Sequence, residues 1–205
     1  MTIYFFETMR KDNPAVLIDA GYLNNISKHL GNGRYLKTKI QSLAINLSKE
    51  LGKYMWCEDI FYYDAPPFQS HNPTIDEIKR KQGYDIMISK LRKGMPKTWV
   101  REGRLQRIDG KFRQKGVDAW IVFDLLRIAQ QKNHETIILL TADTDFVPII
   151  KELRELYDTK IVLAYFTEKV RNSSFSLSNE LWGLFNEKIL ITKGHFFVPE
   201  SKRKE

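Results

Sequence analysis

The chain has 205 residues and a mass of 24.1 kDa, which suits one domain with at most a small extension. Its composition, 42% hydrophobic and 28% charged, is typical of a globular protein with a sizeable core. The single cysteine, Cys57, excludes an intrachain disulfide and a cysteine-rich zinc site. No apolar run is long enough to cross a membrane, and no signal-peptide pattern is present at the N-terminus. We therefore expect a cytoplasmic protein.

Basic residues outnumber acidic ones, with 33 Lys and Arg against 25 Asp and Glu. The formal charge is +8 and the pI is near 9.4. This balance suits a polyanionic partner such as nucleic acid, because basic side chains neutralise phosphates. Many basic proteins bind no nucleic acid, so the charge alone favours this partner only modestly.

The first predicted strand ends on a carboxylate. Residues 1–13 suggest an N-terminal arm or edge strand, and the apolar run 15–18 predicts a buried strand that ends at Asp19. A turn into a helix follows, in which Gly21 permits an unusual backbone angle and Asn24 lies within reach of the same sheet edge. The simpler interpretation of Asn24 is that it caps a helix or turn.

Two helices and a strand come next. Thr38 is a candidate cap for a helix over 39–52, and 73–93 also reads as a helix. Between them, 58–63 predicts a strand closed by Asp64 and two prolines, for which a structural role of Asp64 is favoured.

Residues 99–108 alternate polar and apolar side chains, and Asp109-Gly110 is a strong turn signal. This pattern predicts a strand or hairpin with one solvated, basic face. Arginines interleaved with aromatic residues suit phosphate contact and base stacking, although a merely solvated face is equally consistent. The candidate nucleic-acid contacts are Arg101, Arg104, Arg107, Arg113 and Lys115.

The second half repeats the alternation of strands and helices. A helix over 116–131 begins with Asp118, and the apolar run 137–140 predicts a buried parallel strand. Asp143 and Asp145 follow that strand and precede a helix over 146–158. A strand over 160–166, a helix over 174–187, a short strand over 189–191 and a charged tail from 196 to 205 complete the chain.

This order implies an α/β domain over 14–195, with a mainly parallel sheet covered by helices on both faces. Because parallel strands share one carboxyl edge, Asp19, Asp118, Asp143 and Asp145 are expected to converge there. Carboxylates without basic neighbours suit Mg²⁺ or Mn²⁺, which prefer oxygen ligands. Either Asp143 or Asp145 alone is equally consistent with a helix cap.

The sequence lacks the motifs that mark several other classes of enzyme. The sequence has no phosphate-binding P-loop, no dinucleotide fingerprint and no nucleophile elbow. The four histidines lack zinc-like spacing. A small-molecule phosphatase is disfavoured because no Asp-x-Asp follows the first strand directly.

Four ordered segments resemble NYN domains, and more closely the LabA-like branch of the PIN-like nuclease superfamily. They are VLIDAGYLN (16–24), FYYDAP (61–66), KGVD (115–118) with its helix, and LTADTDFVP (140–148). The resemblance covers about 14–170 and implies a PIN-like three-layer α/β/α sandwich with a metal-dependent ribonuclease site. By this resemblance Asp19, Asp118, Asp143 and Asp145 match the acidic positions, with Asn24 beside the first.

The sequence thus predicts an RNA-hydrolysing enzyme that uses Mg²⁺ or Mn²⁺. A non-catalytic RNA-binding or regulatory domain is the alternative. Related enzymes often carry a further acid on an early helix, for which Glu50 and Glu58 are weak candidates. Nucleases of this type often work as dimers, so a homodimer is a further expectation.

Overall fold

A computed structural model describes residues 13–168 and 175–197 of the chain. All of the predicted N-terminal arm except Asn13, and most of the charged tail, lie outside the described residues. Within them, no helix is both long and apolar enough to span a membrane.

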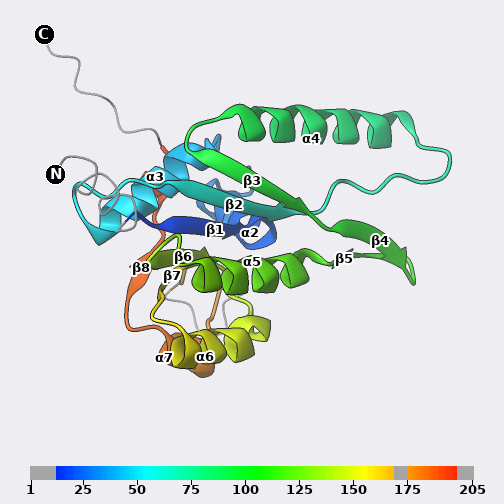
Figure 1. Cartoon of the computed structure of the whole chain (residues 1–205). Coiled ribbons are helices and arrows are strands. Elements are labelled where there is room, and N and C mark those ends of the chain that lie inside the picture. Colours follow the sequence, from blue (N-terminus) through cyan, green and yellow to red (C-terminus); the bar gives the residue numbers. More distant parts are fainter. Residues whose placement is uncertain (1–12, 169–174, 198–205) are drawn as a thin grey trace, which may run out of the picture.

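The centre of the molecule is a six-stranded sheet in the order β3-β2-β1-β6-β7-β8 (Figure 1). Every neighbouring pair in it is parallel, so the predicted mainly parallel sheet is confirmed. The strands are β1 (Ala15–Asp19), β2 (Asp59–Asp64), β3 (Lys97–Glu102), β6 (Thr136–Leu140), β7 (Lys160–Tyr165) and β8 (Lys188–Leu190).

Helices cover both faces of the sheet, which makes three layers (Figure 1). Side chains alternate along β1, so Val16 and Ile18 enter one core while Ala15 and Leu17 enter the other. The first core is covered by α2 (Ala20–Leu30), α3 (Ile40–Leu51) and α4 (Ile75–Lys93). The second is covered by α5 (Val117–Gln131), α6 (Val147–Leu156) and α7 (Asn179–Leu184).

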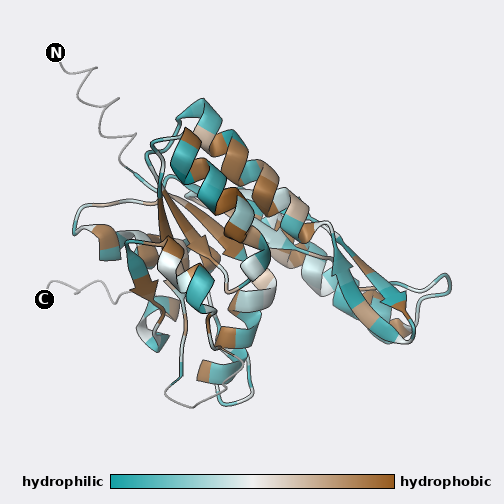
Figure 2. Cartoon of the chain, turned by 90° about the horizontal axis from the view of Figure 1, so that it is seen from below, coloured by the Kyte–Doolittle hydropathy of each residue, from teal (hydrophilic) through white to brown (hydrophobic). Residues whose placement is uncertain are grey.

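The segment predicted as a basic strand or hairpin forms both a strand and a hairpin, and the predicted turn is confirmed. β3 joins the main sheet beside β2, whereas β4 (Arg104–Ile108) and β5 (Lys111–Lys115) form an antiparallel hairpin that turns at Asp109-Gly110. The break falls at Gly103, where a Cβ atom would lie 2.6 Å from the Lys115 carbonyl oxygen. Only glycine permits this close approach. The hairpin projects from the body of the molecule (Figure 2).

Several local predictions were wrong. Thr38 does not cap α3, because the N-cap is Lys39 and the Thr38 hydroxyl donates to the Leu36 carbonyl. Gly21 needs no unusual backbone angle, since α2 begins directly at Ala20. Of the predicted helix over 174–187, the described part is helical only at α7, which ends at Leu184.

A buried charge network ties β3 to α5. Asp124 is 0% exposed, and its carboxylate accepts two hydrogen bonds from Arg101, at 2.9 and 3.0 Å. Arg127 lies 3.0 Å from the same carboxylate, and the Tyr63 hydroxyl donates to it at 3.2 Å. Arg101 therefore does not belong to the solvated basic face on which the sequence placed it. The structural role predicted for Asp124 is observed.

We expect Asp124→Asn to lower the free energy of unfolding by about 3 kcal/mol, because it leaves two partly buried guanidinium groups without their counter-charge. Urea unfolding measures this change. Asp85→Asn is the matched control, since its ion pair with Lys81 is solvent-exposed and contributes at most about 1 kcal/mol. Equal effects of the two substitutions would contradict a stabilising role for the network.

Candidate functional site

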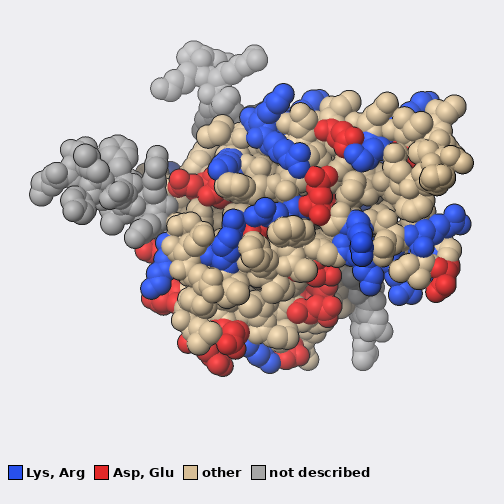
Figure 3. All heavy atoms as spheres, turned by 45° about the vertical axis from the view of Figure 1, so that its right-hand side comes forward, with Lys and Arg blue, Asp and Glu red and all other residues tan. Residues whose placement is uncertain are grey.

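The predicted acidic side chains lie at the carboxyl edge of the sheet. Asp19 is the last residue of β1, and Asp143 follows β6, which pairs with β1. Figure 1 shows β1 to β3 pointing toward the hairpin, and Figure 3, turned to bring that side forward, shows acidic side chains with Lys and Arg on either side. The parallel topology therefore brings the two strand ends together as predicted.

Asp19 is held in place by the start of α2. It is the N-cap of this helix, and its Oδ1 accepts backbone hydrogen bonds from Gly21 at 2.9 Å and from Tyr22 at 3.2 Å. Burial raises the pKa of Asp19, as do the negative charges of Asp118 and Asp143, while the two backbone bonds oppose this. Oδ2 makes no hydrogen bond within the described part of the chain, so Asp19 combines a fixed orientation with an available oxygen.

Asp143 and Asp145 occupy different positions in the loop after β6. Asp143 caps the 3-10 turn η1 (Thr144–Phe146), and its Oδ1 accepts from the Asp145 backbone at 2.9 Å. The sequence had suggested Asp145 as the alternative cap, but the cap is Asp143. The Asp145 side chain is exposed.

Asp118 enters the cluster from α5. Gly116, with φ 82°, turns the chain out of β5, and Asp118 then stands in the first turn of the helix. Partial burial raises the pKa of Asp118, and the charges of Asp143 and Asp145 raise it further. Asp118 and Asp143 thus act on Asp19, and Asp143 and Asp145 act on Asp118, which indicates that the four predicted carboxylates lie near one another.

Asp64 is a member of this site that the sequence assigned to structure. It ends β2 next to Asp19, and burial together with the charges of Asp19 and Glu102 raises its pKa to about 6, against the Ala65 backbone bond. Glu102 lies opposite Asp64 at the end of β3 and is paired with Arg92 at 2.9 Å. The signal was present in the sequence, since Asp64 also follows a strand directly.

Three other candidates lie elsewhere. Asn24 is exposed on the second turn of α2 and borders a neighbouring pocket. Glu58 precedes β2 at the amino edge of the sheet, and Glu50, near the end of α3, binds His195 at 3.1 Å. Neither glutamate is near the cluster, so neither supplies the further acid that the sequence left open.

The hairpin carries its charge mainly on one face. Its register places Arg104 opposite Lys115, and Arg113 and Lys111 point the same way, with no acid among them. Like charges opposite one another destabilise a ribbon, so this face suits an anionic partner. Arg107 lies on the other face, with Phe112, whose ring is 5.3 Å from that of Phe68.

The cluster fits a divalent cation in charge and in donor type. Among the described residues, none of the predicted carboxylates forms an ion pair with a basic side chain. Hard cations are held by carboxylate oxygens of this kind. As the described side chains lie, however, no three His, Cys, Asp or Glu residues are arranged to hold an ion. Binding would therefore require side-chain rotation.

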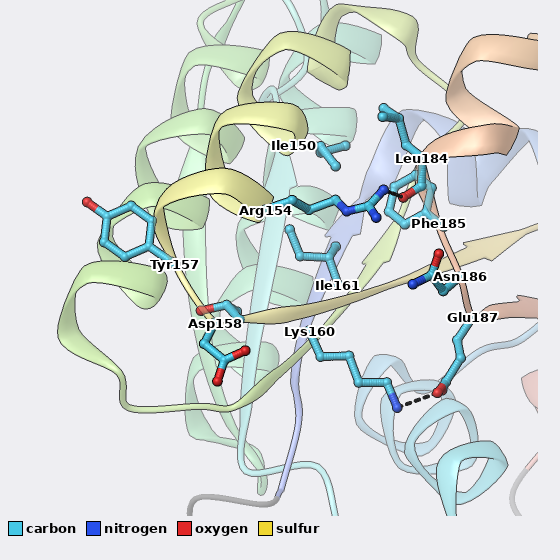
Figure 4. A pocket seen from close by; sticks show the side chains of 11 residues that line it. Ile150, Arg154, Tyr157, Asp158, Lys160, Ile161, Leu184, Phe185, Asn186 and Glu187 are labelled. Atoms are coloured by element: carbon cyan, nitrogen blue, oxygen red, sulfur yellow. Dashed lines mark hydrogen bonds and ion pairs between the residues drawn. The ribbon is translucent and has the colours of Figure 1, made fainter.

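A second hollow lies at the opposite, amino edge of the sheet, between α6, β7 and residues 184–187 (Figure 4). Three of its charged side chains bind groups within the chain. Lys160 pairs with Glu187 at 2.6 Å, and Arg154 donates to the Leu184 carbonyl oxygen. Fewer charged side chains are therefore available to bind a ligand in this pocket than at the acidic edge.

The pKa of Asp64 is raised to about 6 in the native state, whereas its ordinary value is 3.8, so Asp64 lowers stability progressively as the pH rises from about 4 to about 6. We expect Asp64→Asn, which keeps the acceptor for Ala65, to raise the free energy of unfolding by about 1–2 kcal/mol near pH 8 and by little near pH 4. Urea unfolding in EDTA measures both values. A gain that does not depend on pH would contradict the electrostatic cause.

Comparison with known proteins agrees with this architecture. A crystal structure of a protein of unknown function from Vibrio parahaemolyticus RIMD 2210633 has a TM-score of 0.57 and 16% sequence identity, covering 91% of this chain and 96% of the other. At that identity the likeness concerns the fold alone. Curated proteins gave no significant match. The family model described as NYN domain matches residues 13–180. The chain therefore belongs to the NYN domain family, within the PIN-like nuclease superfamily.

Proposed function

We propose that this protein is a ribonuclease that hydrolyses RNA phosphodiester bonds with Mg²⁺ or Mn²⁺. The observation that carries the proposal is the gathering of Asp19, Asp118 and Asp143 at one sheet edge, where Asp118 and Asp143 raise the pKa of Asp19 and Asp143 raises that of Asp118. Carboxylates concentrated in this way favour a bound cation. Membership of a nuclease superfamily supports the reaction class.

We propose a different role for each acidic residue, according to its position at the sheet edge. Asp19, Asp118 and Asp143 would hold the cation, because they come from three different elements around one point. Asp145, which is exposed, would contribute from the rim, and Asp64 is the candidate for the further acid. A divalent cation at such a site acidifies water and neutralises charge on a phosphodiester. Asn24 borders the neighbouring pocket and is not among the residues that would hold the cation.

RNA would be held by the basic face of the hairpin. Lys115 lies at the end of β5, three residues before Asp118, so the cationic face leads directly to the acidic cluster. Phosphates along a strand would contact Arg104, Arg113 and Lys111.

We propose RNA as the partner, the cytoplasm as the location, a homodimer as the assembly and the LabA-like branch as the subfamily.

The central test is cleavage of labelled single-stranded RNA in Mn²⁺. Wild type should cleave, EDTA should abolish cleavage, and Asp143→Asn should slow it by about 100-fold or more, because several kcal/mol of transition-state stabilisation depend on the cation. Asp158→Asn is the matched control, since Asp158 lies at the amino edge. Equal cleavage by wild type and Asp143→Asn would rule out this site.

A non-catalytic RNA-binding domain is the second candidate. The observation that favours it is that the described acidic side chains, as they lie, form no ready cation site. This candidate predicts RNA binding that is unchanged by EDTA, with no cleavage in Mg²⁺ or Mn²⁺.

RNA binding in EDTA tests the hairpin separately from catalysis. Arg113→Ala with Lys115→Ala should weaken binding of single-stranded RNA and reduce the slope of log K against log salt by about 1.4, which corresponds to two phosphate contacts. Lys49→Ala with Lys53→Ala removes the same charge from exposed positions at the amino edge and should change the slope little. The hairpin assignment is wrong if both pairs have the same effect.

A further inference from the structure

A pocket of about 580 Å³ lies between α2, α4 and the segment that leads into α3. This size is within the range of sites for small organic ligands. Residues from these elements and from β2 line it. They include Asn24, Tyr35, Gln41, Tyr62, Met87 and Lys90.

The pocket is adjacent to the acidic cluster. Tyr62 lines it from β2, in register with Ile18 and two residues before Asp64. Because side chains alternate along a strand, Asp64 lies on the same face of β2 as Tyr62. Asn24 lines the pocket one turn beyond the helix start that Asp19 caps. The pocket and the acidic cluster therefore share residues of β2 and of α2.

Apolar side chains around the pocket are exposed without a folding reason. Tyr35 is 65% exposed, Ile86 is 56% exposed and Met87 is 36% exposed. The buried side chains of α4 are Tyr84, Ile88 and Leu91. Ile86 and Met87, on the same helix, are not among them. Exposed apolar groups that border a hollow are typical of ligand sites.

The polar groups in the pocket match a flat heterocycle with donors and acceptors. The Asn24 amide makes no hydrogen bond within the described residues. Gln41 donates to the Leu91 carbonyl oxygen at 3.3 Å and to Thr98 Oγ1 at 3.4 Å, which leaves its own carbonyl oxygen to accept. Lys39 and Lys90 also line the pocket and suit a phosphate. An apolar wall, two amides and two cations together fit a nucleotide.

We propose that this pocket binds one nucleobase of the RNA strand, next to the phosphodiester held at the acidic cluster. This inference rests on the proposed function and adds a base-recognition site to it. The base would stack on the Tyr35 ring and would meet the amides of Asn24 and Gln41 with its edge. An aromatic ring that stacks a base without pairing it is typical of proteins that bind single strands.

Methyl NMR of protein labelled at the methionine methyl groups tests the pocket in EDTA, where no cleavage occurs. The probes are adenosine, guanosine, cytidine and uridine monophosphate. At least one should shift the Met87 methyl signal, identified by Met87→Leu, while the signals of Met55 and Met95, which do not line the pocket, stay in place. Tyr35→Ala should weaken this binding about tenfold or more, because one stacked base is lost.

Tyr54→Ala is the matched control, since Tyr54 is 88% exposed and lies outside the pocket; it should leave binding unchanged. The absence of a Met87 shift up to about 10 mM of every nucleotide would overturn the proposal, because even millimolar affinity would then be lacking. A Met87 shift of the same size with ribose 5-phosphate would also overturn it, by showing that the phosphate alone is bound.

These outcomes are separate from those of the proposed function. If RNA is cleaved but Met87 does not respond to nucleotides, the base pocket fails while the ribonuclease assignment stands. If nucleotides shift Met87 but RNA is not cleaved in Mg²⁺ or Mn²⁺, the catalytic assignment fails. Cleavage of RNA by Tyr35→Ala with a raised KM and a nearly unchanged kcat would support both.

Discussion

The mutual repulsion of carboxylates at one sheet edge is the constraint on which the site depends. Parallel strands all end on the same side, so an acid after each of β1, β2 and β6 has no other place to lie. Backbone N–H groups hold Asp19 and Asp143 in place at the turns that follow. The fold therefore keeps negative charges close together, at a cost that a bound cation would offset.

Aspartate has different surroundings in the Asp124 network and at the acidic edge of the sheet. Asp124 is fully buried, yet two arginines and a tyrosine hydroxyl satisfy its carboxylate. The four predicted acids at the sheet edge are more accessible, and within the described residues they form no ion pair with a basic side chain. Compensation marks a structural role in the first cluster, because a buried charge without partners is costly. Its absence in the second is the reason why we propose a functional role there.

The surroundings of the acidic edge come from segments that are distant in sequence. The hairpin is joined to α5 through Gly116, and Asp19 caps the start of α2. Residues of α4 line the neighbouring pocket. A nucleic-acid strand crossing this edge would meet cations, carboxylates and an apolar hollow in turn. This arrangement connects the basic composition of the chain with one particular path along its surface.

Much of this could be predicted from the sequence. Short apolar runs ending in aspartate indicated buried parallel strands, and the shared direction of such strands was enough to gather Asp19, Asp118 and Asp143. The pairing of Arg101 with Asp124 could not be predicted, because it joins β3 to α5 across 23 residues and depends on β3 entering the main sheet. The same holds for the pocket at Tyr35, whereas Asp64 carried the same strand-end signal as Asp19. Spacing along the chain reports local periodicity, whereas burial, counter-charges and hollows arise only when separate elements pack together.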